Sequence, residues 1–205
     1  MYLTRLTLDQ RNAQARRDLG SAYEMHRTLV RAFVEDDRSS PPRFLWRLEV
    51  GKSSWDHPIV LVQSETIGNW RVIEAVPNYL QCLSESKSIL LDRLVKPNGK
   101  YRFRLLANPT VSRKGKRYGL AGEGEQLAWI QRQGQRHGFE VLSSLVTARD
   151  RCSSPGKDKT AIYIERVCFE GLIAAEQTDS LKKALVDGIG PAKAFGCGLL
   201  SVAPC

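Results

Sequence analysis

The chain has 205 residues, which allows one compact domain or two small ones of about 100 residues each. Hydrophobic residues make up 42% of the sequence and charged residues 26%, and these proportions exclude a disordered or fibrous chain. The 31 Lys and Arg outnumber the 22 Asp and Glu, so the formal net charge of +9 favours a polyanionic partner, either nucleic acid or an acidic membrane surface.

No apolar run approaches the ~20 residues that are needed to cross a bilayer. The segment Met1–Asp9 is too short and too polar for the core of a signal peptide. We therefore expect a cytoplasmic protein with no membrane partner. The five cysteines are scattered and form no Cys-x-x-Cys pair, so we expect reduced thiols that hold neither zinc nor a disulfide.

The first half of the chain predicts elements in the order β-α-β-β-α-β. Alternating apolar and polar residues indicate strands, and apolar residues at helical spacing indicate an amphipathic helix. The elements are a strand over 2–8, a helix over 21–33, strands over 44–50 and 59–63, a short helix over 69–75 and a strand over 100–107. Pro77 ends the short helix, because proline cannot continue one.

The second half repeats this order after a basic connector over 109–118. Its elements are a short strand near 118–121, a helix over 123–133, strands over 139–146 and 160–174, a helix that is capped by residue 179 or 180 and ends at 186, and a strand over 199–202. The fold class is therefore α+β, with two tandem ferredoxin-like (RRM-like) βαββαβ domains over 1–108 and 119–205. Each has a four-stranded antiparallel sheet. Fold alone does not establish function, and no RNP-type aromatic run favours RNA stacking on an open sheet.

The first predicted helix carries side chains suited to RNA cleavage on its polar flank. Tyr23, Arg27 and Arg31 follow at i, i+4 and i+8, and His26 lies beside this line. Cleavage by the 2′-hydroxyl needs a base, an acid and cations that hold the phosphorane charge. Histidine serves as acid or base near neutral pH, and the planar guanidinium of arginine fits phosphate. A solvated helix face with an incidental histidine is the alternative interpretation.

Other parts of the sequence favour no second catalytic centre. His57 lies in a turn and His137 at a helix end, so both are more typical of structural or surface residues. No His, Asp or Glu cluster has metal-ligand spacing, and we expect no metal site. The segment 188–198 has four glycines around Lys193. It either brings backbone close to a phosphodiester or is only a glycine-rich turn.

Several segments resemble one known family. They are Gly188-Ile-Gly-Pro-Ala-Lys-Ala-Phe-Gly-Cys-Gly-Leu-Leu-Ser-Val, Tyr23-Glu-Met-His26-Arg-Thr-Leu, Phe44-Leu-Trp-Arg-Leu-Glu, Tyr101-Arg-Phe-Arg-Leu-Leu-Ala-Asn-Pro and Val167-Cys-Phe-Glu-Gly. Together with shorter matches they span nearly the whole chain. The first is similar to the glycine-rich loop of the RAMP superfamily. The set is most similar to the CasE family, the pre-crRNA endoribonucleases of type I-E CRISPR (Cascade) systems.

The resemblance implies a metal-independent endoribonuclease that needs no cofactor. It would cut CRISPR repeat RNA at the 3′ base of a hairpin, leave 5′-hydroxyl and 2′,3′-cyclic phosphate ends, keep the crRNA and join the other Cascade subunits. Tyr23 and His26 take the positions of the family's catalytic pair. The implied RNA-binding residues are Arg27, Arg31, Arg113, Lys114, Lys116, Arg117, Arg149, Arg151, Lys157, Lys159, Gly188, Gly190, Lys193, Gly196 and Gly198.

Two other functions stay open at this point. A non-catalytic subunit that only binds the RNA hairpin would keep the same basic residues and lack the cleavage. A metabolic ferredoxin-like enzyme would need a small-molecule pocket, which the basic connector and the predicted hairpin between 146 and 160 do not indicate.

Overall fold

The computed structural model of the chain describes residues 1–34, 40–49, 53, 56–155 and 161–205. It divides into two compact units. The first comprises Met1–Ile89 and Ala194–Gly196, and the second comprises Leu90–Lys193 and Cys197–Cys205.

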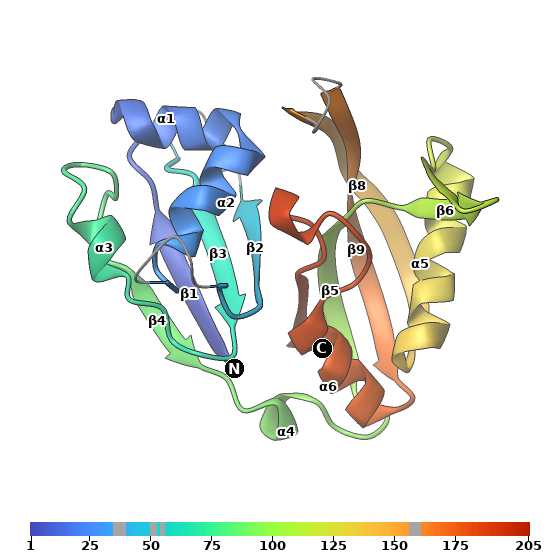
Figure 1. The fold of residues 1–205 in the computed structure, drawn as a ribbon. Helices are drawn as coiled ribbons and strands as arrows, with labels where there is room; N and C mark the ends of the chain where they lie inside the picture. Colours follow the sequence, from blue (N-terminus) through green and yellow to red (C-terminus); the bar gives the residue numbers. More distant parts are fainter. Residues whose placement is uncertain (35–39, 50–52, 54–55, 156–160) are drawn as a thin grey trace. The chain divides into compact units, whose positions relative to one another are not determined.

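The first unit is a four-stranded antiparallel sheet with helices (Figure 1). Its elements are β1 (Tyr2–Thr7), α1 (Ala13–Gly20), α2 (Ala22–Val30), β2 (Phe44–Glu49), β3 (Ile59–Ser64), α3 (Arg71–Glu74) and β4 (Glu85–Ser88). The strand order β2-β3-β1-β4 places the first and third strands at the centre. This is the predicted ferredoxin-like order, in which each central strand pairs on both sides.

The core of the first unit explains why α2 forms where it does. Met25 and Leu29, one turn apart on α2, are each only 1% exposed and pack in the same cluster as Trp46 and Val60 of the sheet. Ser21 separates α1 from α2, and its hydroxyl accepts a hydrogen bond from the amide of Glu24 at 3.3 Å. The core and this cap together fix which flank of α2 stays polar.

The second unit has the same sheet arrangement, and its second and third strands, β8 and β9, are much longer than those of the first unit. Its elements are α4 (Leu91–Leu94), β5 (Lys100–Ala107), β6 (Thr110–Arg113), β7 (Lys116–Gly119), α5 (Glu123–His137), β8 (Phe139–Pro155), β9 (Ala161–Ala175), α6 (Thr178–Asp187) and β10 (Leu200–Pro204). The strand order is β10-β5-β9-β8. Trp129 of α5 stacks on Phe169 of β9 with ring centroids 5.9 Å apart, and both lie in one core cluster.

The structure corrects the predicted domain limits. The sequence pattern assigns the strand over 100–107 to the first domain, but β5 pairs with β9 and β10 in the second sheet, from Lys100 opposite Ala174 onward. The fourth strand of the first sheet is instead β4, which pairs with β1. The units therefore meet in sequence between Ile89 and Leu90. Alternation in Tyr101, Phe103 and Leu105 indicates a strand with one buried face, and it carries no information about which sheet buries it.

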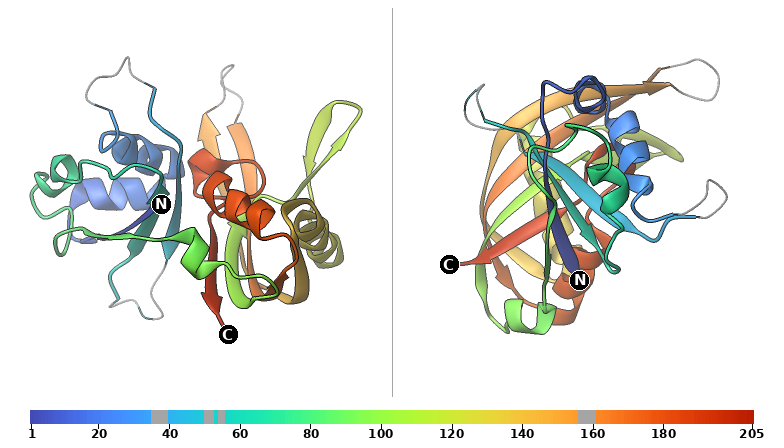
Figure 2. Two further views of the ribbon diagram at one scale, coloured as in Figure 1. Left: turned by 90° about the horizontal axis from the view of Figure 1, so that it is seen from below. Right: turned by 90° about the vertical axis from the view of Figure 1, so that its left-hand side faces the viewer.

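The segment over 109–118 is likewise not a connector between domains. Most of it forms the β6–β7 hairpin, in which Thr110 lies opposite Gly119 and Arg113 opposite Lys116. The strand predicted near 118–121 is partly the second arm of this hairpin rather than the first strand of the second sheet. The hairpin extends from the end of β5 and lies beside α5 (Figures 1 and 2). No helix among the described ranges has the length and apolar character to cross a membrane.

Candidate catalytic helix and basic surfaces

Helix α2 presents Tyr23 and His26 outside its core-facing stripe. Tyr23 is 45% exposed, so its phenol is open to solvent. His26 follows three residues later, at a spacing that places two side chains on neighbouring positions of one helix face. The structure thus brings together on one helix the two residues that the sequence marks as catalytic.

The imidazole of His26 is half-buried against an aromatic cluster. It stacks on Phe44 of β2 with ring centroids 5.1 Å apart and 18° between the ring planes, and Phe44 stacks in turn on Phe33 at 4.8 Å. Nδ1 is buried and has no hydrogen-bond partner among the described residues, so Nε2 is the nitrogen left for an incoming ligand. Burial lowers the pKa of His26, which favours the neutral imidazole. A neutral ring accepts a proton.

Arg27 is held by its neighbours on the helix. Its Nη1 lies 3.3 Å from Glu24 Oε1, and its guanidinium lies 5.8 Å from the centroid of the Tyr23 ring. These contacts orient the arginine toward Tyr23 while a carboxylate partly neutralises its charge. Arg27 therefore places a screened cation beside the phenol.

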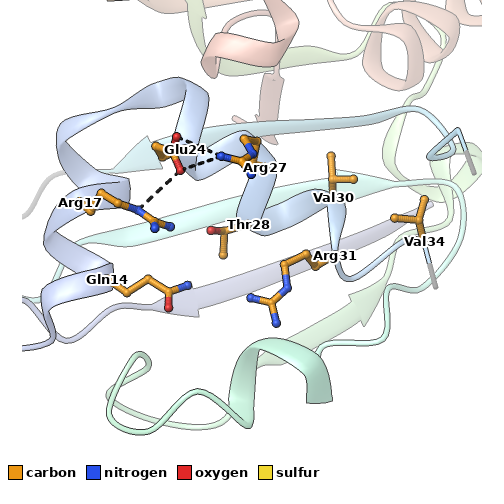
Figure 3. Close-up of a pocket in the computed structure, with 8 residues that line it drawn as sticks. All are labelled: Gln14, Arg17, Glu24, Arg27, Thr28, Val30, Arg31 and Val34. Atoms are coloured by element: carbon orange, nitrogen blue, oxygen red, sulfur yellow. Dashed lines mark hydrogen bonds and ion pairs between the residues drawn. The ribbon is translucent and has the colours of Figure 1, made fainter. Parts of the chain in front are cut away.

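Arg31, the C-cap of α2, contributes to a pocket of about 390 Å³ between α1 and α2 (Figure 3). We call it the α2 pocket. Its charged lining residues are Arg17, Glu24, Arg27 and Arg31. Arg31 has no ion-pair partner within the described part of the chain, and Figure 3 shows its side chain among those that line the pocket. Tyr23 and His26 do not line this pocket. Arg27 is the residue that joins it to the flank with Tyr23.

A buried carboxylate ties α1 to α2. Asp18 of α1 has a fully buried side chain. Its Oδ2 accepts hydrogen bonds from the Thr28 hydroxyl at 2.7 Å and the Tyr79 hydroxyl at 2.8 Å, and its Oδ1 accepts from Arg17 at 2.8 Å. This network fixes Arg17 at the edge of the α2 pocket. Sequence reasoning misses it, because the sequence pattern predicts neither α1 nor the partners of Asp18.

The β6–β7 hairpin concentrates unneutralised positive charge. Lys114 and Gly115 have φ of 48° and 75°, as a tight two-residue hairpin turn requires, and Arg113 lies directly opposite Lys116. Like charges facing each other across strands destabilise a hairpin. Arg113, Lys114, Lys116 and Arg117 are exposed, and none forms an ion pair with a residue that the structure describes. Four such cations on one hairpin match a polyanionic ligand.

The long β8–β9 hairpin differs from the β6–β7 hairpin, because its arginines form ion pairs with carboxylates. Arg149 donates to Glu123 at 2.5 Å, and Arg151 forms an ion pair with Glu165, which lies directly opposite on β9. The two arginines of this hairpin that are predicted to bind RNA, Arg149 and Arg151, therefore already have carboxylate partners. Lys157 and Lys159, from the same assignment, lie outside the described residues.

The glycine-rich segment has backbone requirements of its own. Gly188, Gly190, Gly196 and Gly198 all have positive φ, from 74° to 95°. The amide of Gly198 donates a hydrogen bond to the Leu106 carbonyl of β5 at 2.7 Å. The carbonyl of Gly198 accepts a hydrogen bond from the amide of Ile189 at 2.9 Å. Lys193 Nζ donates to the Gly190 carbonyl at 2.9 Å. Gly196 belongs to the first unit, whereas the other three glycines belong to the second.

No group of three or more His, Cys, Asp or Glu in the described ranges is arranged to hold a metal ion. Three features of the described residues carry an excess of positive charge: the α2 pocket, the β6–β7 hairpin and Lys193 of the glycine-rich segment. Fold and surface together define a tandem ferredoxin-like protein with a polyanion-binding character. The chain belongs to the CRISPR associated protein family, whose family model matches residues 1–204. The resemblance stated from the sequence is thereby confirmed.

Two curated proteins and one solved structure are similar to this chain. The chain is 34% identical, over its whole length and that of the relative, to "CRISPR-associated endoribonuclease Cse3" of Thermus thermophilus. It is 37% identical to "CRISPR system Cascade subunit CasE" of Escherichia coli over 116 residues, which is 50% of this chain and 57% of that one. A solved structure of the endoribonuclease Cse3 bound to a 19 nt RNA superposes with a TM-score of 0.88 at 34% identity and covers 100% of both chains.

Proposed function

We propose that this protein is an endoribonuclease that cuts CRISPR repeat RNA at the 3′ base of a hairpin without a metal ion, keeps the mature crRNA and joins a Cascade complex. The observation that carries the proposal is helix α2, which carries a half-buried imidazole and an exposed phenol and holds Arg27 beside that phenol. The full-length likeness to an endoribonuclease supports it.

In the proposed reaction, Nε2 of His26 takes the proton of the 2′-hydroxyl, and the phenol of Tyr23 holds that hydroxyl by a hydrogen bond. The 2′-oxygen then forms a bond to phosphorus while the bond from phosphorus to the 5′-oxygen breaks. One product carries a 2′,3′-cyclic phosphate. The departing 5′-oxygen takes a proton from solvent, to which this flank of α2 is open, and becomes a 5′-hydroxyl.

The arginines of α2 differ in what they offer the scissile phosphate. Arg31 has no carboxylate partner among the described residues, whereas Arg27 shares its charge with Glu24. Positioned cations that face the negative charge of the transition state lower the barrier. We assign this role to Arg27, which lies beside the Tyr23 ring. We assign Arg31, which lines the α2 pocket, a contact with a neighbouring phosphate of the RNA.

The β6–β7 hairpin is the proposed contact for the RNA stem. An A-form stem has a deep and narrow major groove, so its recognition depends on shape and on phosphate contacts. Arg113, Lys114, Lys116 and Arg117 are exposed and suited to such contacts. Because each neutralised phosphate releases counterions, we expect the affinity for RNA to fall steeply with salt.

The direct test is to incubate the purified protein with repeat RNA from the neighbouring CRISPR array in EDTA and to map the product ends. We expect a single cut at the 3′ base of the hairpin, a 5′-hydroxyl on one product and a 2′,3′-cyclic phosphate on the other. Cleavage that requires added Mg²⁺, or a 5′-phosphate product, contradicts the mechanism. RNA that is bound tightly but left uncut would instead indicate a hairpin-binding subunit without catalysis.

A further inference from the structure

The second unit contains a pocket of about 590 Å³ that the proposed reaction does not use. We call it the α5 pocket. The β6–β7 hairpin contributes Arg117, helix α5 contributes Arg132 and Arg136, and the glycine-rich segment contributes Gly190 and Lys193. Three segments far apart in the sequence thus bring four cations to one cavity. No carboxylate of the described residues lines it.

The arginines of this pocket lack internal neutralisation. Arg117, Arg132 and Arg136 form no ion pair with the residues that the structure describes. Arg132 and Arg136 lie four residues apart on α5, where two like charges repel. The helix dipole favours Arg136 in the last turn and does not reach Arg132. Burial and then the charges of Arg136 and Lys193 lower the pKa of His137, whereas the charge of Asp187 raises it.

The walls of the α5 pocket favour phosphate over a nucleobase. Trp129 lines it but is only 3% exposed, so its ring offers no free face on which a base stacks. Gly190, at φ 81°, lies so close that an added Cβ would be 3.1 Å from the Trp129 ring. A side chain there would therefore crowd the wall. What remains for a ligand is a set of guanidinium and ammonium groups, which bind phosphodiester oxygens.

We propose that the α5 pocket binds phosphodiester groups of the RNA backbone through Arg132 and Arg136 and that it retains the RNA after cleavage. This inference rests on the proposed function. It adds two residues that the sequence does not single out, and it gives them a role in holding RNA rather than in the chemical step. All lining residues belong to the second unit, whereas Tyr23 and His26 belong to the first.

The test compares the double variant Arg132→Gln/Arg136→Gln with the matched control Arg93→Gln/Arg102→Gln, which removes the same charge from exposed arginines of the second unit outside the pocket. The repeat RNA and its cleaved hairpin product are the ligands. We expect the Kd for the product to rise about 100-fold in the pocket variant, roughly tenfold for each charged contact. The salt dependence of log Kd should lose a slope of about 1.8, the value for two phosphates. The control variant Arg93→Gln/Arg102→Gln should keep the wild-type Kd and the wild-type rate of single-turnover cleavage.

The outcomes separate this inference from the proposed function. If the wild type binds and cuts the RNA while the pocket variant binds product as tightly as the control, the α5 pocket does not hold RNA. If the wild type does not cut, the proposed function fails independently of the pocket. Millimolar ADP serves as a second probe. Binding of ADP that disappears in the pocket variant, with RNA affinity unchanged, would assign the cavity to a free nucleotide and overturn the proposal.

Discussion

Replacing His26 with alanine should lower single-turnover cleavage of the repeat RNA by about 10²–10⁴-fold, the range that a general base contributes. The affinity for uncut RNA should change by less than about threefold, because the proposed phosphate contacts lie on arginines and lysines and not on this imidazole. Cleavage is measured in EDTA with protein in excess of RNA, and binding is measured by gel shift.

Two further variants keep this result interpretable. His26 stacks on Phe44, so alanine also removes a packing contact. His26→Phe restores an aromatic ring without a proton acceptor, and it should be as inactive as His26→Ala. His57→Ala, at an exposed histidine outside the site, should cut at the wild-type rate. Unchanged cleavage by both His26 variants would contradict the proposed role of His26 as the general base.

Replacing Asp18 with alanine should have the largest effect on folding. The side chain is fully buried, and its loss leaves the hydroxyls of Thr28 and Tyr79 buried without an acceptor. It also removes the partner of Arg17. We expect the free energy of unfolding of the first unit to fall by about 3–5 kcal/mol, because breaking a buried charged network leaves uncompensated polar groups. Urea unfolding followed by tryptophan fluorescence measures the change.

Tyr79→Phe and Asp92→Ala are the matched comparisons for Asp18. Tyr79→Phe removes one of the hydrogen bonds to the carboxylate and should cost about 1.5–3 kcal/mol, as expected for a bond to a charged group. Asp92 is an exposed aspartate of the second unit, and its replacement should change stability by less than about 1 kcal/mol. An Asp18→Ala midpoint equal to that of Asp92→Ala would show that the network does not stabilise the first unit.

Much of the fold could be predicted because most elements bury one regular face. The sheet alternation of β1 and β5 and the stripe of Met25 and Leu29 on α2 report burial directly in the sequence. Helix α1 could not be found this way, because it buries only Ala15 and Asp18 and therefore has no apolar stripe. Strand β4 escapes prediction for a related reason, since all four of its residues are exposed.

In the candidate site, too, features within one element could be predicted, and contacts between elements could not. Spacing along one helix is enough to group Tyr23 and His26 on α2, and that grouping is confirmed. Contacts between distant segments are beyond reach: Tyr79 meets Asp18 from 61 residues away, and Arg151 meets Glu165 only because of the register of β8 with β9. The sequence shows which residues carry a positive charge, whereas the register of the paired strands determines which of them lie opposite a carboxylate. The catalytic and RNA-binding roles of these residues stay predictions.

The most direct measurement is an NMR titration of the His26 imidazole in the free protein and in its complex with repeat RNA that carries a 2′-deoxy sugar at the cut site. In the free protein, burial should hold the pKa of His26 below the ordinary value of about 6.5. In the complex, a phosphodiester within about 4–6 Å should stabilise the imidazolium and raise that pKa. Identical signals and pKa for His26 in both states, with RNA demonstrably bound, would contradict the placement of the scissile phosphate on α2.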